Sequence, residues 1–285
     1  MRAASAMRVK LRLGALAALA LLIISLPARA AMRDIESVNN QISVLFQAQD
    51  MNHTETARGT VLNTEDAEIS GYALSASVMK DLWLGRDYLA AEIGTVYGQS
   101  NYVGGTFANP AYGSYIGKSG ARIGDFAFRY GSGYVIDADV LVTPYGELGY
   151  HKYDRTLGYG TSGSYLETYT HRYYGIGVRG QITPGDKSVW SVNALVGYTF
   201  GANIAVGLPA PSGFSTRLGN SALCRVGAAL DYALAKNIHA TIGVDFTSWK
   251  YGASAVQPLA SGISLYEPDS KTSNTVIRAG VGYSF

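Results

Sequence analysis

Apolar and polar residues alternate with a period of two along most of the chain. In the segment 273–285, apolar side chains such as Ile277 and Val281 alternate with small or charged ones. The segments 221–234 and 238–250 repeat this arrangement. Side chains of a β-strand point alternately to its two faces, so period two is typical of strands. The pattern predicts strands with one apolar face and one mostly small or charged face.

Ten such runs are present. They span 41–52, 68–79, 88–98, 121–134, 139–153, 169–182, 189–200, 221–234, 238–250 and 273–285. Short connections alternate with five long ones, most of which are rich in Gly, Ser, Asn, Pro and Tyr. Short turns at one end and long loops at the other are typical of outer-membrane barrels. We therefore predict an all-β fold: an antiparallel transmembrane up-and-down β-barrel, formed as one domain by residues 31–285.

The first run is the least certain strand, because Ile35, Val38, Ile42 and Leu45 also fit the apolar stripe of a helix. Nine runs follow it, and a closed up-and-down barrel needs an even number of strands. The alternation within 41–52 supplies the tenth strand. About ten strands are predicted, with eight or twelve as alternatives.

Residues 1–30 have the organisation of a secretory signal peptide. Basic residues come first, an apolar run over 13–26 follows, and Ala28-Arg29-Ala30 ends the segment. The apolar run is shorter than the ~20 residues of a membrane-spanning helix. Cleavage after Ala30 removes five of the 23 basic residues and no acid, which leaves 18 against 21 and a net charge of −3. The mature chain therefore has no basic excess for binding nucleic acid.

Composition narrows the chemistry further. The chain is 47% apolar and 15% charged, and Cys224 is its single cysteine. One cysteine excludes an intrachain disulfide and a Cys₄ zinc site, and we expect Cys224 to face lipid as a small apolar residue. No cofactor or metal is predicted. Aromatic residues near strand ends suggest the interfacial girdle of a membrane barrel: Tyr88, Tyr97, Tyr134, Tyr150, Tyr153, Tyr169, Trp190, Trp249 and Tyr251.

Two segments carry a resemblance to known proteins. Arg278, Gly280, Tyr283 and Phe285 resemble the C-terminal β-signal of outer-membrane proteins. The stretch 143–150, Thr-Pro-Tyr-Gly-Glu-Leu-Gly-Tyr, resembles a strand common in small outer-membrane barrels of the OmpA-like and opacity-porin-like kind. The resemblance is architectural. It implies assembly by the barrel assembly machinery and a Gram-negative outer-membrane location, but it assigns no activity. The even number of strands predicts that both termini are periplasmic.

Alternation also assigns the side chains that point into the lumen. The predicted lumen charges are Glu92, Asp125, Arg129, Glu147, Arg179, Arg225, Asp231, Asp245 and Arg278. A barrel of this size is narrow inside, and a buried charge without a partner is costly. We expect these charges to pair and plug the lumen, with a narrow conduit for ions or small solutes as the alternative.

Catalytic chemistry has weaker support. His53, His151 and His171, together with Asp154, are expected near the extracellular rim, while His239 lies at the opposite end. A histidine base needs a carboxylate and a nucleophile or water within hydrogen-bond reach. No nucleophile elbow or His-Glu-x-x-His motif is present. The sequence does not decide whether the chain is an enzyme, but it favours the absence of catalysis. Histidine and aspartate residues at such a rim are also expected where they contact only water or lipopolysaccharide.

The sequence thus predicts an outer-membrane barrel with a structural or surface-interaction role. Partners would be membrane lipid, lipopolysaccharide and an unidentified surface ligand, and the barrel is expected to be a monomer. Extracellular loops would present the aromatic residues Tyr102, Phe107, Tyr112, Tyr115, Tyr159, Tyr165, Phe214 and Tyr266. A porin-like channel and a hydrolase with a rim histidine are the alternatives.

Overall fold

The computed structural model describes residues 32–285 except 107–108, 186, 209–212, 259–261 and 263. The signal peptide predicted for 1–30 lies outside these residues. In the described part of the chain, no helix has the length and apolar character needed to cross a membrane.

One helix and ten long strands make up most of the described chain. The helix is α2 (Met32–Asn39). The long strands are β1 (Gln41–Ala57), β2 (Thr60–Lys80), β3 (Asp87–Gly104), β4 (Tyr115–Ser132), β6 (Val140–Leu157), β7 (Tyr165–Gly185), β8 (Ser188–Val206), β10 (Ala222–Ala235), β11 (Ile238–Tyr251) and β14 (Asp269–Ser284). Four short strands are β5 (Tyr134–Asp137), β9 (Phe214–Arg217), β12 (Gln257–Pro258) and β13 (Ser264–Leu265).

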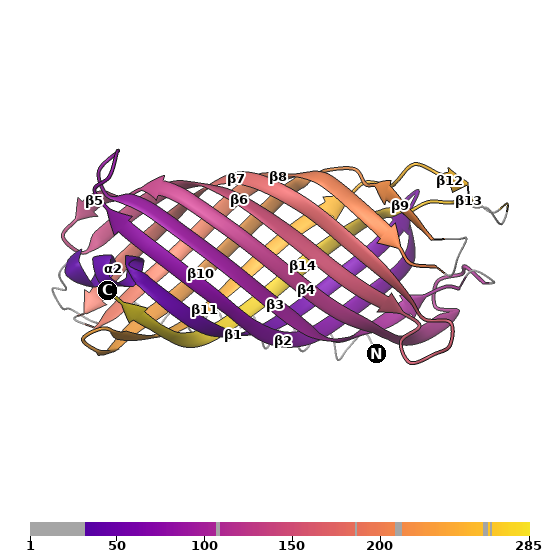
Figure 1. Cartoon of the computed structure of the whole chain (residues 1–285), viewed down its shortest axis with the longest axis horizontal. Helices are drawn as coiled ribbons and strands as arrows, with labels where there is room; N and C mark the ends of the chain where they lie inside the picture. The colour runs from indigo at the N-terminus through magenta and orange to yellow at the C-terminus, as the bar shows by residue number, and fades with distance from the viewer. Residues whose placement is uncertain (1–31, 107–108, 186, 209–212, 259–261, 263) are drawn as a thin grey trace.

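The ten long strands form a closed antiparallel barrel, which confirms the predicted fold class (Figure 1). Each strand pairs with its neighbours in sequence, β8 pairs with β10, and β14 pairs with β1 to close the ring. Figure 1 shows α2 and the C-terminus at one end, here called the α2 end, and β9, β12 and β13 at the other, here called the distal end.

The N-terminal segment, for which both a helix and a strand were considered, contains both. Ile35 and Val38 belong to α2 and are buried, whereas Ile42 belongs to β1 and faces outward. The helical stripe and the strand alternation therefore follow one another along the chain. A strand begins at Gln41, as predicted.

Outward-facing side chains change character along each strand. On β1 they are apolar as far as Ala48 and then polar from Asp50 onward, and on β6 the change comes after Tyr150. The apolar part, here called the lipid band, exposes residues such as Ile42, Val44, Phe46, Tyr72, Leu74, Ile93, Leu148, Ile176, Val196, Val226, Ile242, Ile277 and Val281. The strand segments beyond it, toward the distal end, are here called the distal extension.

The five predicted long loops are shorter than expected, because about half of these residues belong to strands. The segment 53–67 contains only a two-residue turn, Arg58-Gly59, in which both residues have positive φ. Strands of up to 21 residues, at ~3.4 Å per residue and a tilt of ~40°, rise roughly 55 Å, about twice the ~25 Å apolar band of a membrane barrel. Apolar alternation vanishes in the distal extension because outward residues there are polar, so the sequence pattern did not reveal its strands.

Candidate functional site: a lumen closed at both ends

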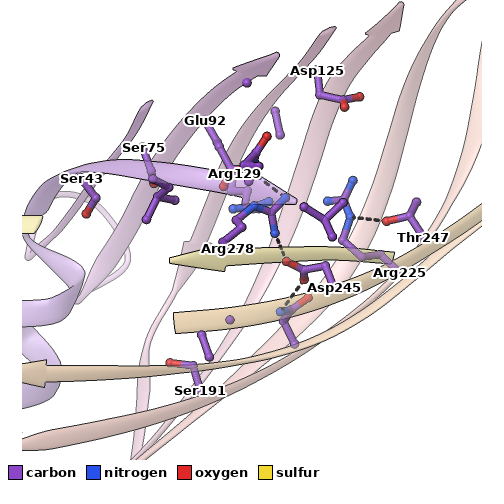
Figure 2. Close-up of a pocket in the computed structure, with 18 of the residues that line it drawn as sticks. Ser43, Ser75, Glu92, Asp125, Arg129, Ser191, Arg225, Asp245, Thr247 and Arg278 are labelled. Carbon is purple, nitrogen blue, oxygen red and sulfur yellow. Dashed lines mark hydrogen bonds and ion pairs between the residues drawn. The ribbon is translucent and has the colours of Figure 1, made fainter. Parts of the chain in front are cut away.

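The predicted lumen charges lie on inward faces, and most belong to two groups of ion pairs (Figure 2). Glu147 is the centre of the first group. Its Oε2 accepts from Arg129 Nε at 2.6 Å, and its Oε1 accepts from Arg225 Nη1 at 2.7 Å and from the Tyr173 hydroxyl at 2.6 Å. The Glu147 side chain is 0% exposed. Two arginines thus share one buried carboxylate.

Arg278 is the centre of the second group. It forms an ion pair with Asp245, and its Nη2 lies 3.3 Å from Glu92 Oε1. Asn193 Nδ2 donates to Asp245 Oδ1 at 3.4 Å. Figure 2 shows Arg278, Asp245 and Glu92 converging in the same part of the lumen as Arg129 and Arg225.

Three predicted lumen charges have other partners. Arg179 donates to the Tyr88 hydroxyl at 2.9 Å and to Ser191 Oγ at 3.2 Å. Asp231 accepts from Thr241 Oγ1 at 2.5 Å. Asp125 Oδ1 accepts from His151 Nδ1 at 2.7 Å.

These side chains surround a polar chamber of about 210 Å³. Besides the charges, it is lined by hydroxyl and amide side chains such as Ser43, Ser75, Gln47 and Asn193. Buried Gln49 and Asn274 each leave one polar side-chain atom without a protein partner. A polar cavity of this size accommodates several water molecules, so we expect the chamber to be hydrated.

Helix α2 closes the chamber at the α2 end. Ile35 and Val38 are 0% and 2% exposed and pack with Met79, Leu141 and Val189 of the barrel wall. Asn39 Nδ2 donates to Gln181 Oε1 at 2.8 Å, and Ser37 Oγ lies 3.1 Å from His239 Nε2. Glu36 forms an ion pair with Arg86. The helix is therefore fixed in the barrel opening by its apolar face and by polar contacts at its edges.

A layer of aromatic rings closes the chamber on the distal side. The rings of His151 and His171 stack with centroids 5.0 Å apart, and Trp249 lies 4.7 Å from His151. His171 Nδ1 lies 2.6 Å from the hydroxyl of Tyr251. All four side chains are buried. These rings project from β6, β7 and β11 and contact one another inside the lumen.

A second closure lies further out, in the distal extension. Arg155 Nη2 is 2.8 Å from Glu55 and donates to the Tyr169 hydroxyl at 2.9 Å. Its Nη1 is 3.3 Å from Glu65, and its Nε donates to Glu167 Oε2 at 2.9 Å. Arg155 and these three glutamates, with Tyr169 and Glu267, are here called the Arg155 cluster. None of these residues is more than 6% exposed.

The sequence pattern missed the Arg155 cluster, because five of its six members lay in segments that were predicted to be loops. Glu55, Arg155 and Glu167 keep the inward parity of β1, β6 and β7, and Glu65 keeps that of β2. Extending the strand alternation past the apolar residues would have placed them inside. Glu267 follows β13 and has no strand register to reveal it.

The candidate catalytic residues do not lie at an open rim, so that prediction was wrong. His53, His151 and His171 are 1–4% exposed inside the barrel, because its wall continues past them. His53 belongs to the outer layer, with Nδ1 2.8 Å from Thr272 Oγ1. Asp154 is on the outer surface, where it accepts from Lys152 Nζ at 2.8 Å. His151 and His171 are brought together, but Asp154 is not beside them.

The predicted girdle divides in two. Tyr97, Tyr134 and Tyr150 are exposed on the outer surface, and Trp190 is half-buried there. Inside the barrel, where they fill the lumen instead of meeting lipid, lie Tyr88, Tyr153, Tyr169, Trp249 and Tyr251. Cys224 is exposed on the outward face.

The predicted assembly signal occupies the end of β14. Tyr283 and Phe285 are exposed to the outside. A Cβ on Gly280 would lie 2.1 Å from the carbonyl oxygen of Val44, so only glycine fits this close approach to β1. The motif thus combines outward aromatics with a glycine at the closing strand pair.

The Arg155 cluster gives a pH-dependent stability. Burial, with the negative charges of Glu55 and Glu167, raises the pKa of Glu267 well above its ordinary value. The folded chain therefore holds this proton more tightly than the unfolded chain. The resulting stabilisation is complete below the ordinary glutamate pKa of about 4.3 and is lost as pH rises through the raised value. The unfolding temperature on heat-modifiability gels should fall with rising pH, and Glu267→Gln should flatten that dependence; an unchanged slope would contradict this origin.

Comparisons with known proteins identify the architecture. No family model matches the chain, and no curated protein matches its sequence. Among solved structures, the chain is similar to the outer membrane protease OmpT from Escherichia coli, with 13% identity over 86% of this chain and 95% of that one and a TM-score of 0.58. The translocator domain of autotransporter NalP from Neisseria meningitidis matches with 14% identity over 99% and 98% of the two chains and a TM-score of 0.40. The chain has the fold of bacterial outer-membrane β-barrels. At this identity the similarity to OmpT concerns the fold alone.

Proposed function

We propose that the chain is an integral outer-membrane barrel whose lumen is closed and whose role is structural or surface interaction. In this proposal the lipid band spans the outer membrane, the α2 end faces the periplasm and the distal extension stands outside the cell. The outer-membrane fold supports the location. The even number of strands supports termini on the periplasmic side.

The observation that carries this proposal is the double closure of the lumen. At the α2 end Ile35 and Val38 are buried against the barrel wall. On the distal side the aromatic layer and the Arg155 cluster lie one above the other, and both contain almost fully buried side chains. Because the side chains that form both closures are almost fully buried, function is expected on the outer surface.

The distal extension offers a surface for recognition. Tyr112, Tyr159 and Tyr266, in the connections at its end, are about half exposed, at 51%, 50% and 46%. Tyr102 instead turns into the lumen, and Phe107 lies outside the described residues. Exposed tyrosines among polar residues suit the binding of sugars or proteins. Lipopolysaccharide, a surface ligand and the assembly machinery are the proposed partners.

Cysteine labelling on intact cells tests the orientation. In a Cys224→Ser background, Ser162→Cys in the β6–β7 turn should react with a membrane-impermeant maleimide, since Ser162 is exposed at the distal end. Ala138→Cys, exposed in the turn before β6 at the α2 end, should react only after the cells are lysed. Labelling of Ala138→Cys on intact cells, with Ser162→Cys protected, would reverse the orientation.

A narrow channel is the second candidate, and the hydrated chamber is the observation that favours it. The chamber of about 210 Å³ lies between the two closures and is lined by charged and polar side chains. Opening both closures would join it to solvent on each side. The two candidates therefore differ in whether ions pass through the membrane-inserted protein: a channel conducts them and a closed barrel does not.

A further inference from the structure

The connection between β11 and β14 lies at the distal end of the barrel and carries the short strands β12 and β13 (Figure 1). Its described residues, 252–258, 262 and 264–268, are here called the distal lid. Two hydrogen bonds join the two sides of the lid. Ser254 N donates to the carbonyl oxygen of Glu267 at 2.9 Å, and Glu267 N donates to Ser254 Oγ at 2.8 Å. The two sides are therefore expected to move together.

Most of the distal lid is exposed or half-buried. Among its described residues only Glu267 and Pro268 are buried. The Glu267 side chain enters the Arg155 cluster, where its Oε1 accepts from the hydroxyl of Tyr169. Because Tyr169 belongs to β7 of the barrel wall, this hydrogen bond joins the lid to the wall. Glu267 is therefore the buried anchor of the distal lid.

Two further contacts of the lid form between neutral groups. Gly252 and Gly219 exchange backbone hydrogen bonds of 2.9 and 3.0 Å at the base of the lid, where it leaves β11. Gln257 Nε2 donates to Thr216 Oγ1 of β9 at 3.1 Å. Neither contact contains a group that titrates, so a change of pH acts on the lid through its carboxyl anchor.

Glu267 differs from the other carboxyl groups of the Arg155 cluster because it has no cation. Arg155 forms ion pairs with Glu55, Glu65 and Glu167. Among the residues that the structure describes, Glu267 takes part in no ion pair, and the tyrosine hydroxyl that it contacts also lies 3.3 Å from Glu55 Oε1. An ionised Glu267 would therefore be a buried charge close to another carboxylate, which is costly. The neutral carboxylic acid suits this position better.

The pKa values agree with this difference. Burial, together with the negative charges of Glu55 and Glu167, raises the pKa of Glu267 well above its ordinary value. Burial also disfavours the charge of Glu55, but the positive charge of Arg155 and two side-chain hydrogen bonds together lower its pKa below the ordinary value. Glu55 thus carries a negative charge, while Glu267 holds a proton.

We propose that the distal lid is a pH-dependent latch, which a protonated Glu267 holds on the Arg155 cluster and which the ionisation of Glu267 releases. As the pH rises, the proton leaves to solvent and the resulting carboxylate is repelled by Glu55. Release exposes the Arg155 cluster on the distal side, while the base of the lid stays attached at Gly252. The aromatic layer lies deeper in the barrel, so release of the lid alone opens no passage. The inference adds a regulated surface to the closed barrel.

Other titratable and charged groups face the Arg155 cluster from the neighbouring strands. They are His53 and Glu55 on β1, Glu65 on β2, Tyr102 on β3, Tyr153 and Arg155 on β6, and Tyr165, Glu167 and Tyr169 on β7. Burial raises the pKa of the four tyrosines, so they stay neutral while a glutamate titrates. Glu65 and Glu167 keep their arginine partner on the wall. His53 gains a charge on acidification, which is the opposite direction.

Pulsed electron paramagnetic resonance between two spin labels measures the position of the lid. In a Cys224→Ser background, one label is placed at Val256→Cys, 61% exposed on the lid, and the other at Asn101→Cys, exposed on β3. The distance distribution should be narrow at about pH 5 and should become longer and broader by about pH 9, both above the ordinary glutamate pKa of about 4.3. All samples should remain heat-modifiable, which separates release of the lid from unfolding.

Substitutions of Glu267 make the test specific. Glu267→Gln keeps a neutral side chain of similar size and should give the narrow distribution at both pH values. Glu267→Ala removes the anchor and should give the broad distribution at both. Glu68→Gln, at an exposed position on the outer face of β2, is the matched control and should respond to pH as the unaltered chain does.

Three results would overturn the latch. They are a distribution that does not change with pH, an equal change in the unaltered chain and in Glu267→Gln, and release on acidification, which would implicate His53. None of them bears on the closed lumen or on the orientation of the barrel, which conductance and cysteine labelling test separately.

Discussion

Arg155→Met is expected to lower the free energy of unfolding by about 3–5 kcal/mol, the range measured when one partner of a buried ion pair is removed. Arg155 is 1% exposed and contacts Glu55, Glu65 and Glu167. Methionine fills much of the same space but leaves these carboxylates facing one another without a cation. Urea titration of the barrel folded into lipid vesicles measures the change.

Two further variants make the Arg155 result specific. Arg217→Met removes an exposed arginine of β9 and should change the unfolding free energy by well under 1 kcal/mol. Combining Arg155→Met with Glu55→Gln and Glu167→Gln should restore part of the lost unfolding free energy, because two of the buried negative charges are then removed together with the arginine. If Arg155→Met were as mild as Arg217→Met, the cluster would not be a buried closure.

Glu147→Gln is expected to be similarly severe, at about 3–5 kcal/mol. The side chain keeps its size and can still accept one hydrogen bond, but Arg129 and Arg225 lose their shared negative charge. The same urea titration measures this loss. Glu68→Gln, an exposed position on the outer face of β2, is the matched control.

The double variant Glu147→Gln with Arg225→Met tests whether these residues act together. Partners in one ion-pair group show coupling energies of about 0.5–3 kcal/mol, whereas independent sites add. The double variant should therefore lose less stability than the sum of the two single variants. Simple additivity would show that Glu147 and Arg225 do not stabilise each other.

The sequence predicted the membrane-embedded half of the barrel well, because lipid imposes a strict rule there. Ile42 and Val281 must face hydrocarbon while Arg278 and Glu147 must not, so the alternation of side chains follows directly from the environment. The same parity places charges such as Arg129 and Asp245 on the inward face, where they line the chamber. Within the lipid band, the one-dimensional pattern is therefore enough.

The sequence pattern did not predict the strands of the distal extension, because outward side chains that face water need not be apolar. Asp50 and Thr54 face outward as readily as an apolar residue would, so β1 looks like a loop after Ala48. The alternation also does not show which inward residues contact one another, because those contacts depend on strand register and on barrel closure. His151 pairs with His171 directly across β6 and β7, whereas the contact between Arg155 and Glu65 joins residues that are 90 positions apart in the chain. Only the closed barrel brings such residues together.

The most direct test of the closed lumen is the electrical conductance of the purified mature barrel in a planar lipid bilayer. The account predicts no stable unitary steps for the unaltered chain. Steps should appear when both closures are removed together, by deleting residues 32–39 and replacing Arg155, Tyr169 and Trp249 with serine, provided that the variant remains heat-modifiable. Stable unitary steps from the unaltered chain, altered in size by Glu147→Gln, would contradict the closed lumen and establish a channel instead.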